Sequence, residues 1–300
     1  PNLTEETMKK VTTTTVGGLS RKENDFDYMA SNELKSVLFE GSVLAQPASG
    51  TIESIQSIEL EDVKGFIKKN LVSSKLIVVL GGDLDLDSTK EKIAKIVDSL
   101  NKGSVTKIPS YEVRKKAKTS ILKKETEQAY VYFGAPYNMK AGDEDYYKAR
   151  IATFILGTGG FGSRLMEEIR VKRGLAYSAY ARVSVTKSSS SLTGYLQTKL
   201  ESMEEAKQTV QEVVAKFVKK GVTKEELEQT KKFLAGSEPL RVETMSQRLS
   251  RTFIEYYNGH ELGHSEKEIE KIKNIKLKDL NVFIKEHTEI LDMSFAIVTK

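Results

Sequence analysis

The spacing of apolar residues predicts helices over most of the first hundred positions. Thr4 fits the N-cap of a helix that we expect to fade in the β-branched run at residues 11–16, before Gly17 and Gly18. Further amphipathic helices are expected at residues 28–39, at residues 61–70 and after an N-cap at Ser88. The unbroken apolar run at residues 76–80 ends at two glycines and is expected to form a strand.

The pattern changes near residue 100. Residues 101–118 are polar and basic and contain Gly103 and Pro109, so we expect them to form a linker. Strands are then expected at residues 119–122, 129–133, 175–185, 192–200 and 293–298. Helices are expected among them at residues 143–156, 203–219, 224–234, 244–257 and 277–287. This order predicts an α+β fold in which a mostly antiparallel sheet packs on helices.

Residues 157–180 read GTGGFGSRLMEEIRVKRGLAYSAY and combine two glycine turns with a short helix and a strand. We expect the helix to run from an N-cap at Ser163 to about Lys172, with acidic residues early and basic residues late, as suits the helix dipole. A turn at Gly174 would then place Arg170 and Tyr177 near the same corner. An arginine and a tyrosine that converge in this way can hold a peptide carbonyl or carboxylate.

Spacing alone favours a different interpretation of these two residues. Tyr177 shares strand parity with Leu175 and Ala179, which predicts that its ring packs in the core. Arg170 would then make an ordinary surface ion pair.

The chain contains an internal repeat. Residues 58–68 (IELEDVKGFIK) recur as residues 275–285 (IKLKDLNVFIK). Upstream, residues 3–6 parallel residues 222–225, and downstream, residues 76–80 parallel residues 295–298. We therefore expect two related domains: the C-terminal part of a first domain plus linker at residues 1–112, and a complete second domain at residues 113–300. A fortuitous likeness between two helix–strand units is the alternative.

Composition narrows the function classes. The chain has 300 residues, of which 39% are hydrophobic and 30% are charged, as is ordinary for a soluble globular protein. A net charge of +5 from 47 basic and 42 acidic residues is weak support for nucleic-acid binding. The absence of cysteine excludes disulfides and thiolate chemistry. No apolar run approaches the roughly 18 residues of a membrane span, and a bacterial periplasm or cytoplasm both remain open as the compartment.

The central stretch resembles the second-half signature of the pitrilysin/insulinase-type (inverzincin) zinc metallopeptidases, which include the mitochondrial processing peptidase. A glycine-rich turn, S-R-L, E-I-R and R-G-L-A-Y followed by a strand are all present. The resemblance implies two homologous sheet-plus-helix domains of the LuxS-like metallopeptidase type, the first incomplete here. It also implies that Arg170 and Tyr177 contact the substrate. Gly159 and Gly160 would allow close passage of the backbone at the substrate cavity, or simply shape the turn.

The resemblance also raises the question of zinc. In the family, H-x-x-E-H supplies two histidine ligands and a general base, and a glutamate on a later helix is the third ligand. This sequence contains no H-x-x-E-H, and the third-ligand position falls near Gly17 or Gly18, neither of which can bind a metal. We therefore expect neither a zinc site nor a catalytic residue in this chain. The motif helix would belong to a part of the first domain upstream of residue 1.

Two further motifs match the patterns of a zinc site and a dinucleotide site, but their sequence contexts do not fit these sites. His260-Glu261-Leu262-Gly263-His264 fits H-E-x-x-H, but Gly259 breaks the preceding helix and Ser265 resembles the cap of the next one. We expect a surface loop with two exposed histidines. The glycines of residues 157–162 fit the G-x-G-x-x-G dinucleotide fingerprint, but they follow a predicted helix where that motif requires a strand.

Three functions are left open by these patterns. The first is a substrate-holding, non-catalytic component of a zinc metalloendopeptidase, inactive by itself and paired as a homo- or heterodimer with a zinc-bearing subunit. The second is an interaction or scaffold protein of the same fold that has lost proteolysis. The third is a self-contained zinc peptidase acting through His260 and His264.

Overall fold

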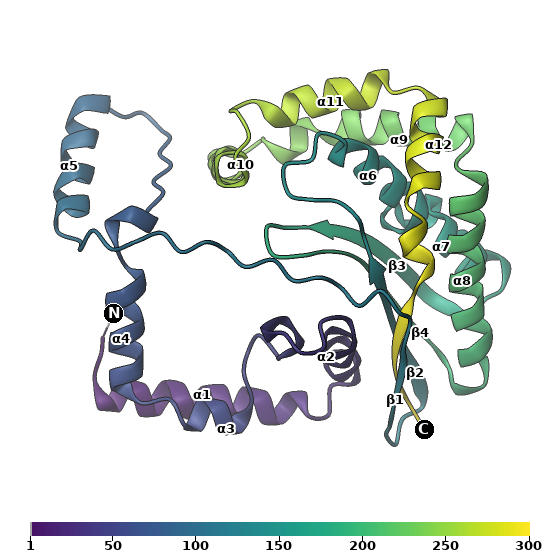
Figure 1. Cartoon of the computed structure of the whole chain (residues 1–300), viewed down its shortest axis with the longest axis horizontal. Coiled ribbons are helices and arrows are strands. Elements are labelled where there is room, and N and C mark those ends of the chain that lie inside the picture. The colour runs from purple at the N-terminus through teal and green to yellow at the C-terminus, as the bar shows by residue number, and fades with distance from the viewer. Residues whose placement is uncertain (1) are drawn as a thin grey trace.

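Five strands form one sheet in the order β1-β5-β2-β4-β3 (Figure 1). The computed structural model describes residues 2–300. The strands are β1 (Thr119–Lys123), β2 (Gln128–Pro136), β3 (Ala176–Val185), β4 (Ser190–Lys199) and β5 (Ser294–Thr299). Only β1 and β5 run parallel, and the other neighbouring pairs are antiparallel. The predicted α+β class with a mostly antiparallel sheet is therefore confirmed.

Helices from the second half of the chain cover one face of this sheet (Figure 1). Phe133, Leu196 and Phe295 point from the strands into the main core, where they are at most 1% exposed. The same core contains buried residues of the covering helices because their apolar residues recur at helical spacing. These helices are α6 (Tyr146–Thr153), α8 (Met203–Lys220), α9 (Lys224–Ser237), α11 (His264–Asn274) and α12 (Leu277–Glu286). Helix α10 (Met245–Asn258) lies between α9 and α11 in the chain and contributes no residue to this core.

One helix from the first part of the chain, α2 (Phe26–Leu38), packs on the opposite face against β2 and β5. Leu34 and Leu38 form a second buried cluster there with Ala296. The Tyr132 hydroxyl donates a hydrogen bond of 3.0 Å to Asp27. This packing joins the first part of the chain to the sheet.

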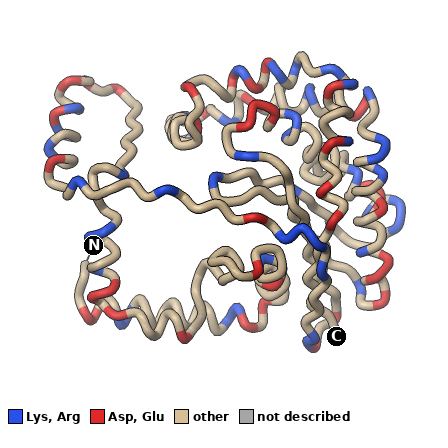
Figure 2. Tube along the Cα trace, in the orientation of Figure 1, with Lys and Arg blue, Asp and Glu red and all other residues tan. Residues whose placement is uncertain are grey.

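The remaining N-terminal helices extend away from the sheet (Figure 1). They are α1 (Glu5–Lys22), α3 (Ile52–Gln56), α4 (Leu60–Asn70) and α5 (Leu86–Asp98). Residues 101–118, the predicted linker, contain no helix or strand and run from α5 towards β1. Basic and acidic residues alternate along much of this part of the chain without a large region of one sign (Figure 2).

The expected end of the first helix is wrong, because α1 continues through Gly17 and Gly18 to Lys22. The hydroxyls of Thr13 and Thr14 donate to the carbonyls of Lys9 and Lys10, so the β-branched run is accommodated within the helix. The N-cap of α5 is Asp85, whose carboxylate accepts from the Ser88 N–H, and Ser88 itself is not the cap.

The strand expected at residues 76–80 is not formed. Leu76, Val78 and Leu80 are 40%, 43% and 49% exposed. Within residues 2–300 the five strands all belong to the one sheet, so this apolar segment has no neighbouring strand to pair with. An isolated extended segment is unstable without cross-strand hydrogen bonds.

Candidate functional site

The predicted site lies where α6 leads into the glycine turn and then into β3. After α6 the chain continues as a π-helix, η3 (Phe154–Thr158), and a short turn, η4 (Gly160–Gly162). Helix α7 (Arg164–Met166) and a second π-helix, η5 (Glu167–Lys172), follow, with Ser163 at the predicted N-cap position. Single π-helical turns inside α-helices occur often at functional sites.

Arg170 and Tyr177 are brought together at this corner. The guanidinium carbon of Arg170 lies 4.1 Å from the centroid of the Tyr177 ring. The phenol ring is 80% exposed, so it does not pack in the core. No ion pair of Arg170 occurs within residues 2–300, which leaves its charge available to a ligand.

Phe161 completes this arrangement and was not predicted. Its ring centroid lies 4.5 Å from the Arg170 guanidinium, so the cation contacts two aromatic rings. Phe161 is 66% exposed, which is unusual for so large an apolar side chain. Phe161 belongs to no periodic apolar pattern, so its position between two glycines was the only feature of the sequence that could have indicated it.

A β-bulge explains why strand parity gave the wrong environment for Tyr177. The register of β3 against β4 shifts between Ala176 and Ala179, so Tyr177 and Ser178 of β3 stand opposite the single residue Gln197 of β4. Ala176 and Ala179 are both buried, at 8% and 3% exposure. The extra residue breaks the two-residue alternation and turns Tyr177 to the outside.

The turn at Gly174 fixes the distance between the arginine and the tyrosine. Gly174 adopts φ +62°, a left-handed conformation that glycine adopts without strain. Its N–H donates to the Arg170 carbonyl, and the Leu175 N–H donates to Ile169. On the strand side, the Thr198 hydroxyl donates to the Leu175 carbonyl at 2.7 Å. Hydrogen bonds on the η5 side and on the β3 side therefore fix the conformation of this turn.

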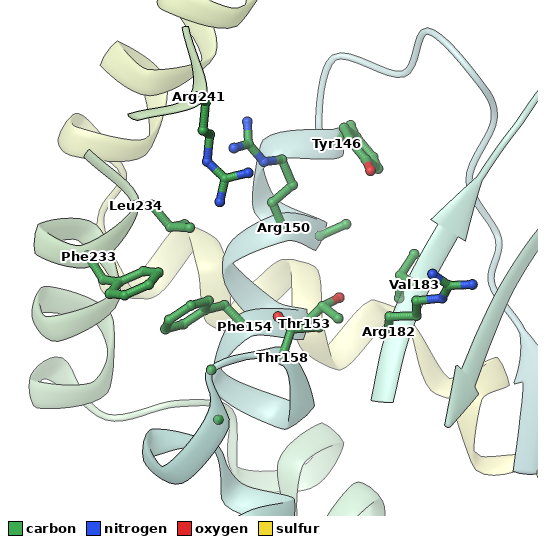
Figure 3. Close-up of a pocket in the computed structure, with 13 residues that line it drawn as sticks. Tyr146, Arg150, Thr153, Phe154, Thr158, Arg182, Val183, Phe233, Leu234 and Arg241 are labelled. Carbon is green, nitrogen blue, oxygen red and sulfur yellow. The ribbon is translucent and has the colours of Figure 1, made fainter. Parts of the chain in front are cut away.

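The predicted glycines lie beside a cavity of about 590 Å³ between α6, α9 and β3 (Figure 3). Gly159 and Gly160 line it, and Gly160 adopts φ +59°. Arg170 and Tyr177 are not among the lining residues. Phe161 directly follows Gly160, so the turn connects the cavity with the Phe161–Arg170–Tyr177 cluster.

The glycine turn does not have the context of a dinucleotide site. It follows the π-helix η3 and not a strand, as the sequence indicated. The first glycine, Gly157, is needed for packing: a Cβ there would come within 2.5 Å of the Ala181 backbone nitrogen. This glycine therefore allows η3 to approach β3 closely.

The residues present do not fit a zinc ion. Within residues 2–300, no group of three or more His, Asp or Glu side chains is arranged to hold a metal. Gly17 and Gly18, at the position of the third family ligand, lie in the middle of α1 and carry no donor side chain.

His260 and His264 form a stacked pair and not a chelate. Their ring centroids are 3.8 Å apart and the planes differ by 9°, so the in-plane nitrogen lone pairs do not converge on one point. Burial, and then the neighbouring His264, lowers the pKa of His260. Both rings are partly buried, which corrects the expectation of exposed histidines. Helix α11 begins at His264, and Ser265 is bound to Glu255 instead of capping it.

Comparison with known proteins identifies the family. The family described as "Peptidase M16 inactive domain" matches residues 57–234. The chain is 46% identical over 299 residues to a Helicobacter pylori protein named "Non-peptidase homolog YmxG", covering 100% of this chain and 69% of that protein. It is 27% identical to an "Uncharacterized zinc protease YmxG" of Bacillus subtilis, covering 82% of this chain and 59% of the relative.

Solved structures agree on the fold. A crystal structure of a peptidase M16 inactive domain from Pseudomonas fluorescens matches with a TM-score of 0.92 and 24% identity, covering 100% of this chain and 72% of that one. A chain of complex III2 from Candida albicans matches with a TM-score of 0.81 and 17% identity, covering 97% of this chain and 70% of that one. At these identities the likeness bears on the fold alone.

One finding concerns the membrane. No helix within residues 2–300 combines the length and apolar character needed to cross a bilayer.

The matching family model, the related sequences and the shared fold agree with one another, and the chain belongs to the peptidase M16 inactive-domain family.

Proposed function

We propose that this chain is the substrate-holding, non-catalytic component of a zinc metalloendopeptidase of the M16 family. The observation that carries the proposal is the exposed cluster of Phe161, Arg170 and Tyr177. A guanidinium with no ion-pair partner in residues 2–300 and an exposed phenol stand side by side on a corner fixed by Gly174. Such a pair fits the carbonyls of an extended polypeptide.

The aromatic rings support the binding role of Arg170. An arginine side chain loses about 2 kcal/mol of rotamer entropy when it is immobilised on binding. Contact with two rings restricts the guanidinium before a ligand arrives, so less entropy is lost on binding. The Tyr177 hydroxyl can donate to a second carbonyl. Gly159 and Gly160 would let the substrate backbone pass close to the protein.

In this proposal the metal and the general base come from elsewhere. A zinc-bearing partner subunit, or a part of the first domain outside this chain, would supply them. The contribution of this chain is to position the peptide, and positioning alone can account for several kcal/mol of a catalytic barrier. A homo- or heterodimer is the expected assembly.

The same proposal assigns each of the two parts of the chain to one domain of the peptidase fold. Residues 113–300 would be the complete second domain and residues 1–112 the C-terminal part of the first, with the linker. The half-exposed apolar residues Leu76, Val78 and Leu80 support this assignment, because a strand-like run with no partner fits part of a larger sheet.

Peptide binding and cleavage together test the function. Fluorescein-labelled β-casein, an unfolded polypeptide, should bind the wild type, and Arg170→Ala should weaken binding about tenfold or more. Tyr177→Phe should reduce cleavage by a mixture with a zinc-bearing family member from the same cell. Arg21→Ala and Tyr256→Phe, which change exposed residues remote from the corner, are matched controls.

The result that contradicts the proposal is also specific. Unchanged binding and cleavage in both Arg170→Ala and Tyr177→Phe, with far-UV circular dichroism unchanged, would remove the assigned role. A shared loss in the control variants would point to a general effect of charge or surface.

A scaffold protein of the same fold is the alternative. The name of the Helicobacter pylori relative, a non-peptidase homolog, favours it. The two functions differ in one measurement. A scaffold would assemble with its partner without changing the rate at which that partner cleaves casein, whereas a substrate-holding subunit would raise this rate.

A further inference from the structure

The cavity beside the glycine turn contains a cluster of positive charge that the proposed function does not explain. Arg150 on α6, Arg182 on β3 and Arg241 after α9 line it, and no acidic side chain does. Arg150 and Arg241 extend towards each other across the cavity, while Arg182 points away from them on the opposite wall (Figure 3).

The two facing arginines differ in how they are neutralised. Arg150 donates to Glu268 at 2.6 Å, and this pair is largely buried. Arg241 is exposed and has no ion pair within residues 2–300. The nearby Glu238 is bound instead to Arg251 at 2.5 Å. One positive charge therefore remains at the mouth of the cavity, beside a second guanidinium that still has free N–H donors.

The other lining groups suit a side chain with a short hydrocarbon part and an anionic end. Phe154 and Phe233 lie 4.8 Å apart and form an apolar wall together with Leu234. Burial raises the pKa of Tyr146, so its phenol stays protonated at neutral pH and can donate a hydrogen bond. Guanidinium groups match the geometry of a carboxylate and bind it through two parallel N–H donors.

We infer that this cavity is a subsite for an acidic side chain, Asp or Glu, of the polypeptide held at the neighbouring corner. Arg241 and Arg150 bind the carboxylate, and Phe154 and Phe233 contact its methylene groups. The glycine turn connects this cavity to Phe161, so one extended chain can contact both. The inference rests on the proposed peptide-holding function and adds a substrate preference to it.

A pair of peptides tests the subsite. Two fluorescein-labelled, unstructured peptides of about 20 residues would differ only in a central Glu or Gln and be titrated by fluorescence polarisation. The Glu peptide should bind the wild type about tenfold more tightly at low salt, as expected for one charge-assisted bidentate contact. Arg241→Gln should reduce this preference to about twofold or less. Because Arg241 is exposed, its replacement should leave the fold intact.

Arg182→Gln is the matched control. It removes the same charge from the lining of the same cavity, but its guanidinium lies on the opposite wall and points away from the pair, so the preference for Glu should persist (Figure 3). An equal loss in Arg182→Gln and Arg241→Gln would reduce the effect to general electrostatics and overturn the subsite.

The remaining outcomes separate this inference from the function on which it rests. Equal binding of both peptides to the wild type would overturn the subsite and leave the peptide-holding function standing. Binding of neither peptide would overturn both. Displacement of the Glu peptide by inorganic phosphate below about 1 mM would assign the cavity to a free anion and overturn the assignment to a peptide side chain.

Discussion

The two copies of the internal repeat begin alike and end differently. Helix α4 begins at Leu60 and α12 begins at Leu277, which are corresponding positions of the repeat. After α12 the chain forms β5, the strand between β1 and β2, in which every residue is buried. After α4 the corresponding apolar run, residues 76–80, forms no strand and is half exposed.

This difference shows that a local sequence pattern is enough to form a helix, whereas a strand also needs neighbouring strands in a sheet. A helix satisfies its own backbone hydrogen bonds, so a similar pattern produces a similar helix in both copies. A strand needs partners for its N–H and C=O groups. Residues 294–299 have them on both sides, and residues 76–80 have none within residues 2–300. The variants below test this contrast at corresponding positions.

The largest difference in stability cost is expected between the strand β5 and the corresponding segment of the first copy. Ile297→Asp should cost at least about 5 kcal/mol and prevent stable folding, because it buries an unpaired charge at a position with no exposed surface. Leu80, its counterpart by the offset that relates Ile58 to Ile275, is 49% exposed, and Leu80→Asp should change stability by about 0.5 kcal/mol or less. Urea unfolding followed by circular dichroism measures both. A large cost at Leu80 would show that residues 76–80 are packed in solution.

The next largest difference in stability cost is expected between corresponding phenylalanines of α12 and α4. Phe283 on α12 is 5% exposed and its counterpart Phe66 on α4 is 69% exposed. Phe283→Ala should cost about 3–4 kcal/mol through lost burial and a residual cavity. Phe66→Ala should cost about 0.5 kcal/mol or less. Similar midpoints for the two variants in urea would contradict the contrast.

The segment after α12 also contains a hydrogen bond between His287 and the Glu289 carboxylate that the first copy lacks. Burial opposes the charge of Glu289, but hydrogen bonds from His287 and the Asn138 N–H outweigh it and lower the pKa of the carboxyl. A lowered pKa stabilises the fold above the unfolded pKa of about 4.3, and this contribution is lost as pH falls through the folded value. Glu289→Gln should cost about 1–2 kcal/mol at pH 7 and much less at pH 3.

Unfolding curves of wild type and Glu289→Gln at both pH values measure this contribution. An equal difference at pH 7 and pH 3 would mean that the charge of Glu289 is not involved. The corresponding residue of the first copy, Val72, cannot titrate.

The smallest difference is expected at the helix caps. Thr4 and Thr223 cap α1 and α9, and each side chain accepts from a backbone N–H three residues on. Only Thr223 has a reciprocal bond, donated by its N–H to Glu226. Thr223→Ala should cost about 1 kcal/mol and Thr4→Ala about 0.5 kcal/mol. A larger cost at Thr4 would show that α1 contributes more to global stability than its exposure suggests.

The sequence predicted most of the second part of the fold because its elements obey clear periodicities. All five strands of the sheet and the helices from residue 203 to residue 257 lie within a few residues of the expected positions. The errors fall where the deciding interaction is not local. Helix α1 continues through its β-branched run and both glycines, against local propensity, and the missing sheet partner prevented a strand at residues 76–80.

The candidate site was predictable only in part. The resemblance indicated Arg170 and Tyr177, and the structure places them together, but strand parity alone assigned the tyrosine to the core. Phe161 gave no periodic signal. Arg150 and Arg241 belong to separate helical segments, and nothing in the sequence indicates that they face each other across one cavity.

The extra residue in β3 has a consequence for comparing this chain with its relatives. If the register shifted so that β3 paired with β4 without the bulge, strict alternation would place Tyr177 on the same face as Ala179 and turn its phenol towards the interior. A relative could then keep both the arginine and the tyrosine in an alignment and still lose the exposed pair. The pairing of this short stretch with β4, more than the identity of its residues, should therefore distinguish the relatives in which the arginine and the tyrosine are exposed together.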